Sequence, residues 1–199
     1  MKEIESKAWV YQKDKKRVLD FLNNETKSIN LGKIKKDTMY SIQSDNDLDK
    51  KTEFRLREEK LDTGGVVGRE DVVYTVTRKT RSYTDSGTEV NEELEFFVDS
   101  SDKFHEFVSQ LGYEVMYTKE KKVKQFTLQG AKYTILFEYV EMSELSKIGD
   151  LLEIEIVCDD NVSEIEVSSV EDYILSFFKT LNINTQIESL PYGKLLGMF

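Results

Sequence analysis

Glu3-Ile4-Glu5-Ser6-Lys7, near the start of the chain, alternates charged side chains with apolar or small ones, and a similar stretch, Glu153-Ile154-Glu155, lies far along the sequence. Alternation of this kind is typical of a β-strand, whose side chains point to opposite faces with a period of two. Two carboxylates and an ammonium group therefore share one face of the first strand. Same-face neighbours lie about 6.5–7 Å apart, close enough for two carboxylates to hold a divalent ion. We expect this face to meet water or a charged ligand.

The simplest interpretation is that the charged face is only solvated, as it is on many antiparallel sheets. The same pattern recurs, however, at Arg55/Arg57, at Lys122/Lys124 and at Glu153/Glu155. A solvated face usually mixes the two signs, whereas here the acidic pairs and the basic pairs fall on different strands. This separation suits an anion bound together with a metal ion, because carboxylates are ligands of Mg²⁺ or Mn²⁺ while lysine and arginine bind phosphate oxygens.

Length and composition limit the class of protein. The 199 residues suit one domain, so we expect residues 1–199 to form a single unit. Lys and Arg number 28 against 38 Asp and Glu, and the net charge of −10 argues against non-specific binding to nucleic acid or to an anionic membrane. The single cysteine, Cys158, excludes an intramolecular disulfide, and neither a membrane span nor a signal peptide is visible. The sequence thus predicts a cytoplasmic protein.

Alternating stretches recur along the chain and indicate about eight strands or more. Most of them are joined by short connections, such as the turns at 85–87 and 129–130, so the sheet is predicted to be antiparallel. One segment is expected to form two short strands, at 28–34 and 37–42, separated by Lys35-Lys36. Three helices are predicted, at 13–24, 101–112 and 168–181.

The fold class follows from the polar faces of the strands. Charged residues on so many strands are expected to line the inside of a closed barrel, which at about eight strands is wide enough for one small ligand. The apolar faces, with Ile4, Leu56, Ile154 and Ile156, then pack outward. We therefore predict a mainly β (α+β) protein, a closed antiparallel barrel or tunnel with a charged lumen and helices packed outside. The amphipathic tail beyond Leu190 is expected to cover one end.

Four segments carry a more specific pattern: the opening E-x-E-x-K, Asp37-Thr38-Met39-Tyr40, Phe54-Arg55-Leu56-Arg57, and I-G-D-L-L-E-I-E at 148–155. Together they resemble the CYTH family, also called triphosphate tunnel metalloenzymes, which includes class IV adenylyl cyclases, thiamine triphosphatases and inorganic triphosphatases. The resemblance extends from Met1 to about Cys158. The opening motif combined with the late G-D-x-x-E-x-E is its most specific part, and it implies the same barrel with helices outside.

The resemblance also implies roles for individual residues. One or two Mg²⁺ or Mn²⁺ ions would be held by Glu3, Glu5, Glu138, Glu153 and Glu155. Phosphate oxygens of a nucleoside or other triphosphate would be bound by Lys7, Arg55, Arg57, Lys79, Lys122 and Lys124. Lys7 is in addition a candidate catalytic residue, because burial beside other cations lowers the pKa of a lysine. Class IV cyclases tend to be homodimers, so the resemblance also implies a homodimer, although the sequence itself leaves the oligomeric state open.

Two reactions fit these residues. In an adenylyl cyclase the ribose 3′-hydroxyl of ATP attacks the α-phosphorus and pyrophosphate leaves, whereas in a triphosphatase water attacks a terminal phosphorus of thiamine triphosphate or tripolyphosphate. The Asp-Thr-x-Tyr and Gly-Asp-x-x-Glu-x-Glu segments look most like those of class IV cyclases, so cyclisation is favoured. A third hypothesis, from another class, is a non-catalytic module that binds polyphosphate or a nucleotide. Lys122-Val123-Lys124 departs from the Lys-x-Arg of many family members.

Overall fold

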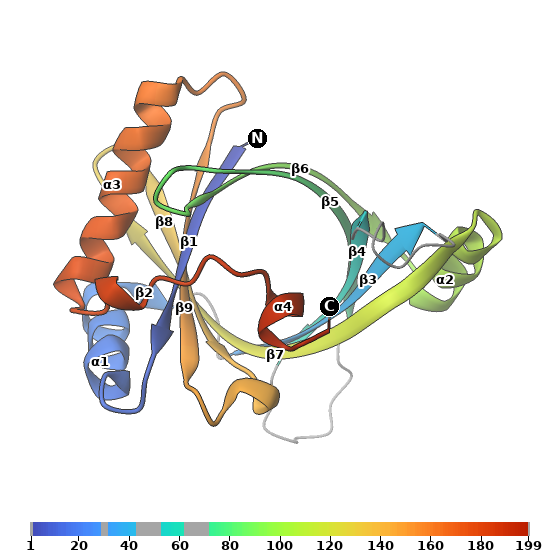
Figure 1. Cartoon of the computed structure of the whole chain (residues 1–199), viewed down its shortest axis with the longest axis horizontal. Helices are drawn as coiled ribbons and strands as arrows, with labels where there is room; N and C mark the ends of the chain where they lie inside the picture. Colours follow the sequence, from blue (N-terminus) through green and yellow to red (C-terminus); the bar gives the residue numbers. More distant parts are fainter. Residues whose placement is uncertain (1, 29–31, 43–52, 62–71, 199) are drawn as a thin grey trace.

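The computed structural model describes residues 2–28, 32–42, 53–61 and 72–198. Its strands form one antiparallel sheet that closes into a barrel (Figure 1) in the order β7-β3-β4-β5-β6-β1-β9-β8, with β8 pairing back to β7. The strands of the ring are β1 (Lys2–Val10), β3 (Lys33–Ile42), β4 (Phe54–Leu61), β5 (Val73–Tyr83), β6 (Glu89–Val98), β7 (Tyr113–Gln129), β8 (Thr134–Glu141) and β9 (Asp150–Cys158), while the short β2 (Lys27–Ser28) pairs with β7 outside it.

The predicted barrel is confirmed, and its register explains why the two acid-rich segments belong together. β1 pairs with β9 from Lys2↔Cys158 to Val10↔Asp150. Glu5 therefore lies opposite Glu155, and Lys7 lies opposite Glu153. Segments from the two ends of the sequence thus place their charged side chains on one continuous inner face.

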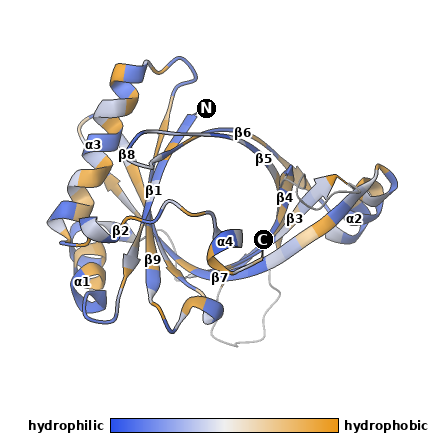
Figure 2. Ribbon diagram, viewed as in Figure 1, coloured by the Kyte–Doolittle hydropathy of each residue, from blue (hydrophilic) through white to orange (hydrophobic). Residues whose placement is uncertain are grey.

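Helices cover parts of the outer face. α1 (Lys15–Glu25) and α3 (Glu164–Thr180) lie against β1, β8 and β9 (Figure 1) and pack on the fully buried Ile4, Ile154 and Ile156. α2 (Ser101–Gln110) covers a second cluster through Val108, which packs with Leu56. The prediction that the apolar strand faces point outward is thereby confirmed, and Figure 2 shows both hydrophilic and hydrophobic residues on the strands and on these helices. None of the described helices combines the length and the hydropathy of a membrane span.

A third apolar cluster lies inside one end of the barrel. It contains one inward-facing residue from each of four strands, and each is the neighbour of a charged residue on the inner face of its strand: Trp9, Val123, Val140 and Leu151. The short helix α4 (Tyr192–Leu195), which follows the turns η2 (Ser143–Leu145) and η3 (Asn184–Gln186) in the chain, packs on this cluster. The C-terminal tail thus covers part of one barrel end beside β7 (Figure 1), as the sequence predicted.

Two local predictions are wrong. β3 is continuous across Lys35-Lys36, because Lys35 points inward to pair with Glu138 while Lys36 is exposed, so the two lysines do not interrupt the strand. α3 begins at Glu164 rather than at 168, since the Ser163 side chain caps it by accepting a hydrogen bond from the Glu166 backbone. The sequence also predicts a polar loop at 44–51 and a glycine-containing connection at 60–68. Lys60 and Leu61 belong to β4, and the rest of both segments lies outside the described residues.

Candidate active site in the barrel lumen

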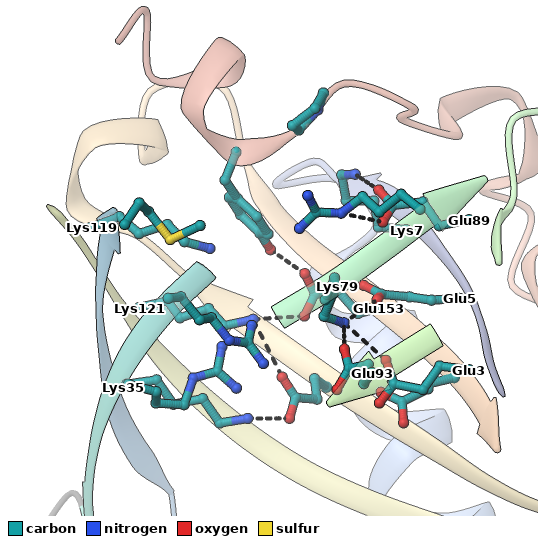
Figure 3. Close-up of a pocket in the computed structure, with 18 of the residues that line it drawn as sticks. Glu3, Glu5, Lys7, Lys35, Lys79, Glu89, Glu93, Lys119, Lys121 and Glu153 are labelled. Carbon is teal, nitrogen blue, oxygen red and sulfur yellow. Dashed lines mark hydrogen bonds and ion pairs between the residues drawn. The ribbon is translucent and has the colours of Figure 1, made fainter. Parts of the chain in front are cut away.

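A cavity of about 480 Å³ occupies the lumen of the barrel, a size typical of small-molecule sites. Every residue predicted for the site lines it, except Lys122 and Lys124. Charged residues dominate its lining: Glu3, Glu5, Lys7, Lys35, Arg55, Arg57, Lys79, Arg81, Glu89, Glu93, Glu95, Lys119, Lys121, Glu138, Glu153 and Glu155. Figure 3 shows Lys35, Lys119 and Lys121 on one side of the cavity and Glu3, Glu5 and Glu93 on the other.

The structure corrects the predicted positions of Lys122 and Lys124. Both are exposed on the outer face of β7, and the lysines on its inner face are the buried Lys119 and Lys121. Lysine occupies four of the six positions from 119 to 124, so the sequence shows no alternation from which the inner face could be chosen. A shift of one residue moves every side chain to the other face.

Asp37 of β3 organises one group of cations. It is fully buried and pairs across the sheet with Arg57 on one side and Lys119 on the other. Arg57 donates from Nε to Oδ1 at 2.7 Å and from Nη2 to Oδ2 at 2.9 Å, and Lys119 Nζ lies 3.3 Å from Oδ2. Burial favours the protonated acid, but the cations outweigh it and hold the pKa of Asp37 well below its usual range. In Lys119 burial prevails and lowers the pKa to about 7.

Glu138 and Glu153 are the partners of a second group of lysines. Lys35 Nζ lies 2.5 Å from Glu138, and Lys121 Nζ lies 2.8 Å from Glu153 and 3.4 Å from Glu138. These lysines outweigh burial, so that the pKa of Glu138 is well below its usual range and that of Glu153 is also lowered. Both carboxylates therefore stay ionised and neutralise the lysines.

The opposite wall carries an acidic cluster, defined here as Glu3, Glu5 and Glu155. One carboxylate oxygen of each residue lies within 4.8 Å of those of the other two. Lys79 is the cation that pairs with this cluster: its Nζ lies 2.9 Å from Glu3 and 3.9 Å from Glu5, and it also pairs with Glu93. One ammonium group does not balance these carboxylates, and burial followed by their mutual repulsion raises the pKa of Glu155 to about 9. Burial is also the main cause that raises the pKa of Glu3 to about 7.

The acidic cluster fits a divalent cation. Carboxylate oxygens are the ligands that Mg²⁺ and Mn²⁺ prefer, and a cation would relieve the excess negative charge. Asn91 of β6 provides a second observation, because it faces Glu3 in the ladder and is 0% exposed. Neither its amide oxygen nor its amide nitrogen has a hydrogen-bond partner among the described residues. A buried amide without partners is uncommon in proteins, and this one lies beside Glu3 although it does not itself line the cavity.

Tyr192 of α4 belongs to the site although the sequence did not single it out. Its hydroxyl donates to Glu153 Oε1 at 2.5 Å. The centre of its ring lies 4.0 Å from Lys119 Nζ and 5.3 Å from Lys121 Nζ. Burial and the charge of Glu153 raise the pKa of this phenol well above its usual value, so it remains a donor. The tail therefore completes the wall that carries the lysines.

No protein-family model and no curated protein matches the sequence. Solved structures match over nearly the whole chain. A protein from Pyrococcus horikoshii is 18% identical, with 98% of this chain and 97% of that chain covered and a TM-score of 0.69. A candidate adenylate cyclase from Vibrio parahaemolyticus is 15% identical, with 98% and 97% covered and a TM-score of 0.69. A Hippeastrum protein, described as a candidate adenylyl cyclase with a dominant triphosphatase activity, is 11% identical, with 98% and 94% covered and a TM-score of 0.62.

At these identities the comparisons show the fold alone. The chain has the fold of proteins described as candidate adenylate cyclases. Fold and site together define the class of this protein: a closed antiparallel β-barrel whose lumen carries mostly cations on the wall formed by β3, β4 and β7 and mostly carboxylates on the wall formed by β1, β8 and β9.

Proposed function

We propose that this protein is a metal-dependent enzyme that binds a triphosphate in the barrel lumen and breaks one of its phosphorus–oxygen bonds. The observation that carries the proposal is the separation of charge between the two walls of the cavity. A triphosphate bears about four negative charges, and its chemistry depends mainly on positioning and on neutralising those charges. One wall supplies cations for the phosphate oxygens, and the other supplies carboxylates for a metal ion.

The residues divide this work between them. Arg57, held by Asp37 through Nε and Nη2, keeps its Nη1 hydrogens and one Nη2 hydrogen for phosphate oxygens, whereas Lys35 and Lys121 act as point charges. Glu3, Glu5 and Glu155 would hold Mg²⁺ or Mn²⁺, which when bound polarises a phosphoryl oxygen. Lys119 can accept a proton near neutral pH because its pKa is lowered to about 7. Lys7 lines the same cavity, and its Nζ lies 3.6 Å from Glu89. It remains a proposed phosphate ligand and is the second candidate for the proton acceptor.

Cyclisation of ATP is the reaction we propose first, because the sequence segments look most like those of class IV adenylyl cyclases. A specific observation supports hydrolysis as the second candidate: a protein of the same fold is described as having a dominant triphosphatase activity. Both reactions need the same cations and carboxylates, and they differ in the nucleophile and in the phosphorus atom attacked.

The products decide between these reactions. The full chain is incubated with ATP, thiamine triphosphate or tripolyphosphate in the presence of Mg²⁺ or Mn²⁺, and the products are separated by chromatography. Cyclic AMP with pyrophosphate establishes the cyclase, and orthophosphate with a diphosphate product establishes the triphosphatase. Tight binding without any product at either metal contradicts an enzyme and indicates a binding module.

Substitution of two adjacent lysines, Lys121 and Lys122, tests which face of β7 binds the phosphates. Lys121→Met should lower kcat/KM by about 100-fold, since it removes a buried cation aimed at the site. Lys122→Met should leave kcat/KM within about twofold, because Lys122 lies on the outer face. Steady-state kinetics with one substrate measures both variants, and melting temperatures show whether each is folded. Similar losses in the two variants would contradict the assignment of the inner face.

A further inference from the structure

Among the uncharged residues that line the lumen are three on the neighbouring strands β3 and β7. They are here called the methionine–tyrosine patch, defined as Met39 of β3 with Met116 and Tyr117 of β7. All three side chains line the cavity beside the charged residues. Met39 is 5% exposed, and it pairs across the sheet with Tyr117 on one side and with Arg55 on the other. Uncharged thioethers and a phenol ring contribute nothing to neutralising phosphate groups, so the patch calls for another explanation.

A β-bulge in β7 enlarges this patch. Met39 pairs with Tyr117 but the next residue, Tyr40, pairs with Val115, so that Met116 is an extra residue in β7. In a regular strand Met116 and Tyr117 would point to opposite faces. Here both line the cavity, whereas Val115 is 43% exposed. Bulges redirect side chains and are frequent beside active sites, and this one adds a second apolar side chain to the lumen.

The patch lies next to the cations that we propose for the phosphates. Lys35, Asp37 and Met39 follow one another on the inner face of β3, about 6.5–7 Å apart. Because Asp37 holds Arg57 and Lys119, a group attached to phosphates bound by these cations can reach Met39. The organic part of a phosphate ester would therefore meet the patch while its charged tail stays among the cations.

Arg55 forms the polar border of the patch. One of its terminal nitrogens, Nη2, lies 3.8 Å from Glu95, which also accepts a hydrogen bond from Thr77 at 2.6 Å. The buried Nε of Arg55 has no hydrogen-bond partner among the described residues. A guanidinium group stacks on flat rings and donates hydrogen bonds in its own plane, so Arg55 suits a ring that carries acceptor atoms.

We propose that the methionine–tyrosine patch is a subsite for a flat heterocyclic group, so that the substrate is an organic triphosphate ester and not inorganic tripolyphosphate. This inference rests on the proposed function and specifies its substrate class. Methionine adapts its shape to an aromatic face and makes favourable sulfur–ring contacts, and tyrosine stacks on heterocycles. The cations bind any triphosphate, whereas the patch distinguishes those that carry a ring.

The test compares ATP and thiamine triphosphate, which carry rings, with tripolyphosphate, which carries none, using the full chain with Mg²⁺ or Mn²⁺. We expect kcat/KM for at least one ester to exceed that for tripolyphosphate by about tenfold or more. Met116→Ser should reduce this ratio about tenfold and leave tripolyphosphate turnover within about twofold. Val115→Ser is the matched control, because Val115 lies beside the bulge but is exposed, and it should not alter the ratio.

The ratio of kcat/KM for an ester to kcat/KM for tripolyphosphate is measured on one preparation of each protein. A smaller folded fraction lowers both values equally and leaves the ratio unchanged. Should Met116→Ser fail to fold, Tyr117→Leu gives the same readout, because it removes the polar ring while keeping an apolar side chain. Equal kcat/KM for all three compounds in the unmodified chain, or equal losses for all three in Met116→Ser, would overturn the subsite and leave the triphosphate enzyme intact. Turnover of none of the three would overturn both the enzyme and its subsite.

Discussion

Asp37→Ala should lower the free energy of unfolding by about 3–5 kcal/mol. Asp37 is fully buried and pairs with the Arg57 fork and with Lys119. Removing it leaves two cations inside the barrel without their carboxylate, and breaking one side of a buried ion pair costs far more than the pair itself contributes. Strands β3, β4 and β7 meet at this residue, so we expect the loss to affect the whole barrel.

Urea denaturation of the unmodified protein and of Asp37→Ala measures this difference in the free energy of unfolding. Lys36→Ala is the matched control, because Lys36 precedes Asp37 in the same strand but is exposed, and its replacement should change stability by no more than about 0.5 kcal/mol. Tripolyphosphate should stabilise Asp37→Ala more than it stabilises the unmodified protein, since the anion can replace the missing carboxylate. A loss below about 1 kcal/mol would show that the cations do not depend on Asp37.

The pH dependence of stability follows from the same ion pairs. An acid whose pKa is lower in the folded than in the unfolded state stabilises the fold above its unfolded pKa, and this contribution is lost as the pH falls below that value. The pKa of Asp37 is held well below its usual range, so the unmodified protein should lose this stabilisation as the pH falls below about 4. The stability of Asp37→Ala should fall less over the same pH interval.

The part of the site that the sequence predicted lies where charged and apolar residues alternate without ambiguity. Ile4 between Glu3 and Glu5, and Ile154 between Glu153 and Glu155, leave one choice of face. Burial of the isoleucines against α1 and α3 then directs the acids into the lumen. Alternation cannot show which strands are neighbours, and the pairing of β1 with β9 is seen only in the structure.

The remainder of the site depends on contacts that local pattern does not encode. Lys119 and Lys121 are distinguished from Lys122 only by the register of β7 against β3. Lys35 and Asp37 face inward because β3 runs on as one strand, which two adjacent lysines in the sequence argued against. Tyr192 enters the lumen because α4 packs on an apolar cluster built from four strands. Each of these placements is decided by tertiary structure, which overrides local propensity.

Glu155→Gln should lower kcat/KM by about 100-fold or more at a fixed Mg²⁺ or Mn²⁺ concentration. The variant removes one of the three carboxylates of the acidic cluster and keeps the shape of the side chain. In the unmodified protein we expect Mn²⁺ to raise the melting temperature, because an ion that binds only the folded state stabilises it, and this increase should disappear in the variant. Glu120→Gln, on the outer face of β7, is the control and should keep both the activity and the response to Mn²⁺.

In the absence of metal, Glu155→Gln should stabilise the protein, although it lowers the activity when metal is present. The pKa of Glu155 is raised from 4.5 to about 9 by burial and then by Glu3 and Glu5. An acid whose pKa is higher in the folded state binds a proton that unfolding releases, so stability declines as the pH rises from 4.5 towards 9. Glutamine does not titrate, and metal-free Glu155→Gln should be more stable than the unmodified protein at pH 9 by about 1 kcal/mol or more. If Glu155 only stabilised the fold, Glu155→Gln would instead be less stable than the unmodified protein. If the acidic cluster binds a cation, Glu155→Gln should be inactive and, in the absence of metal, more stable.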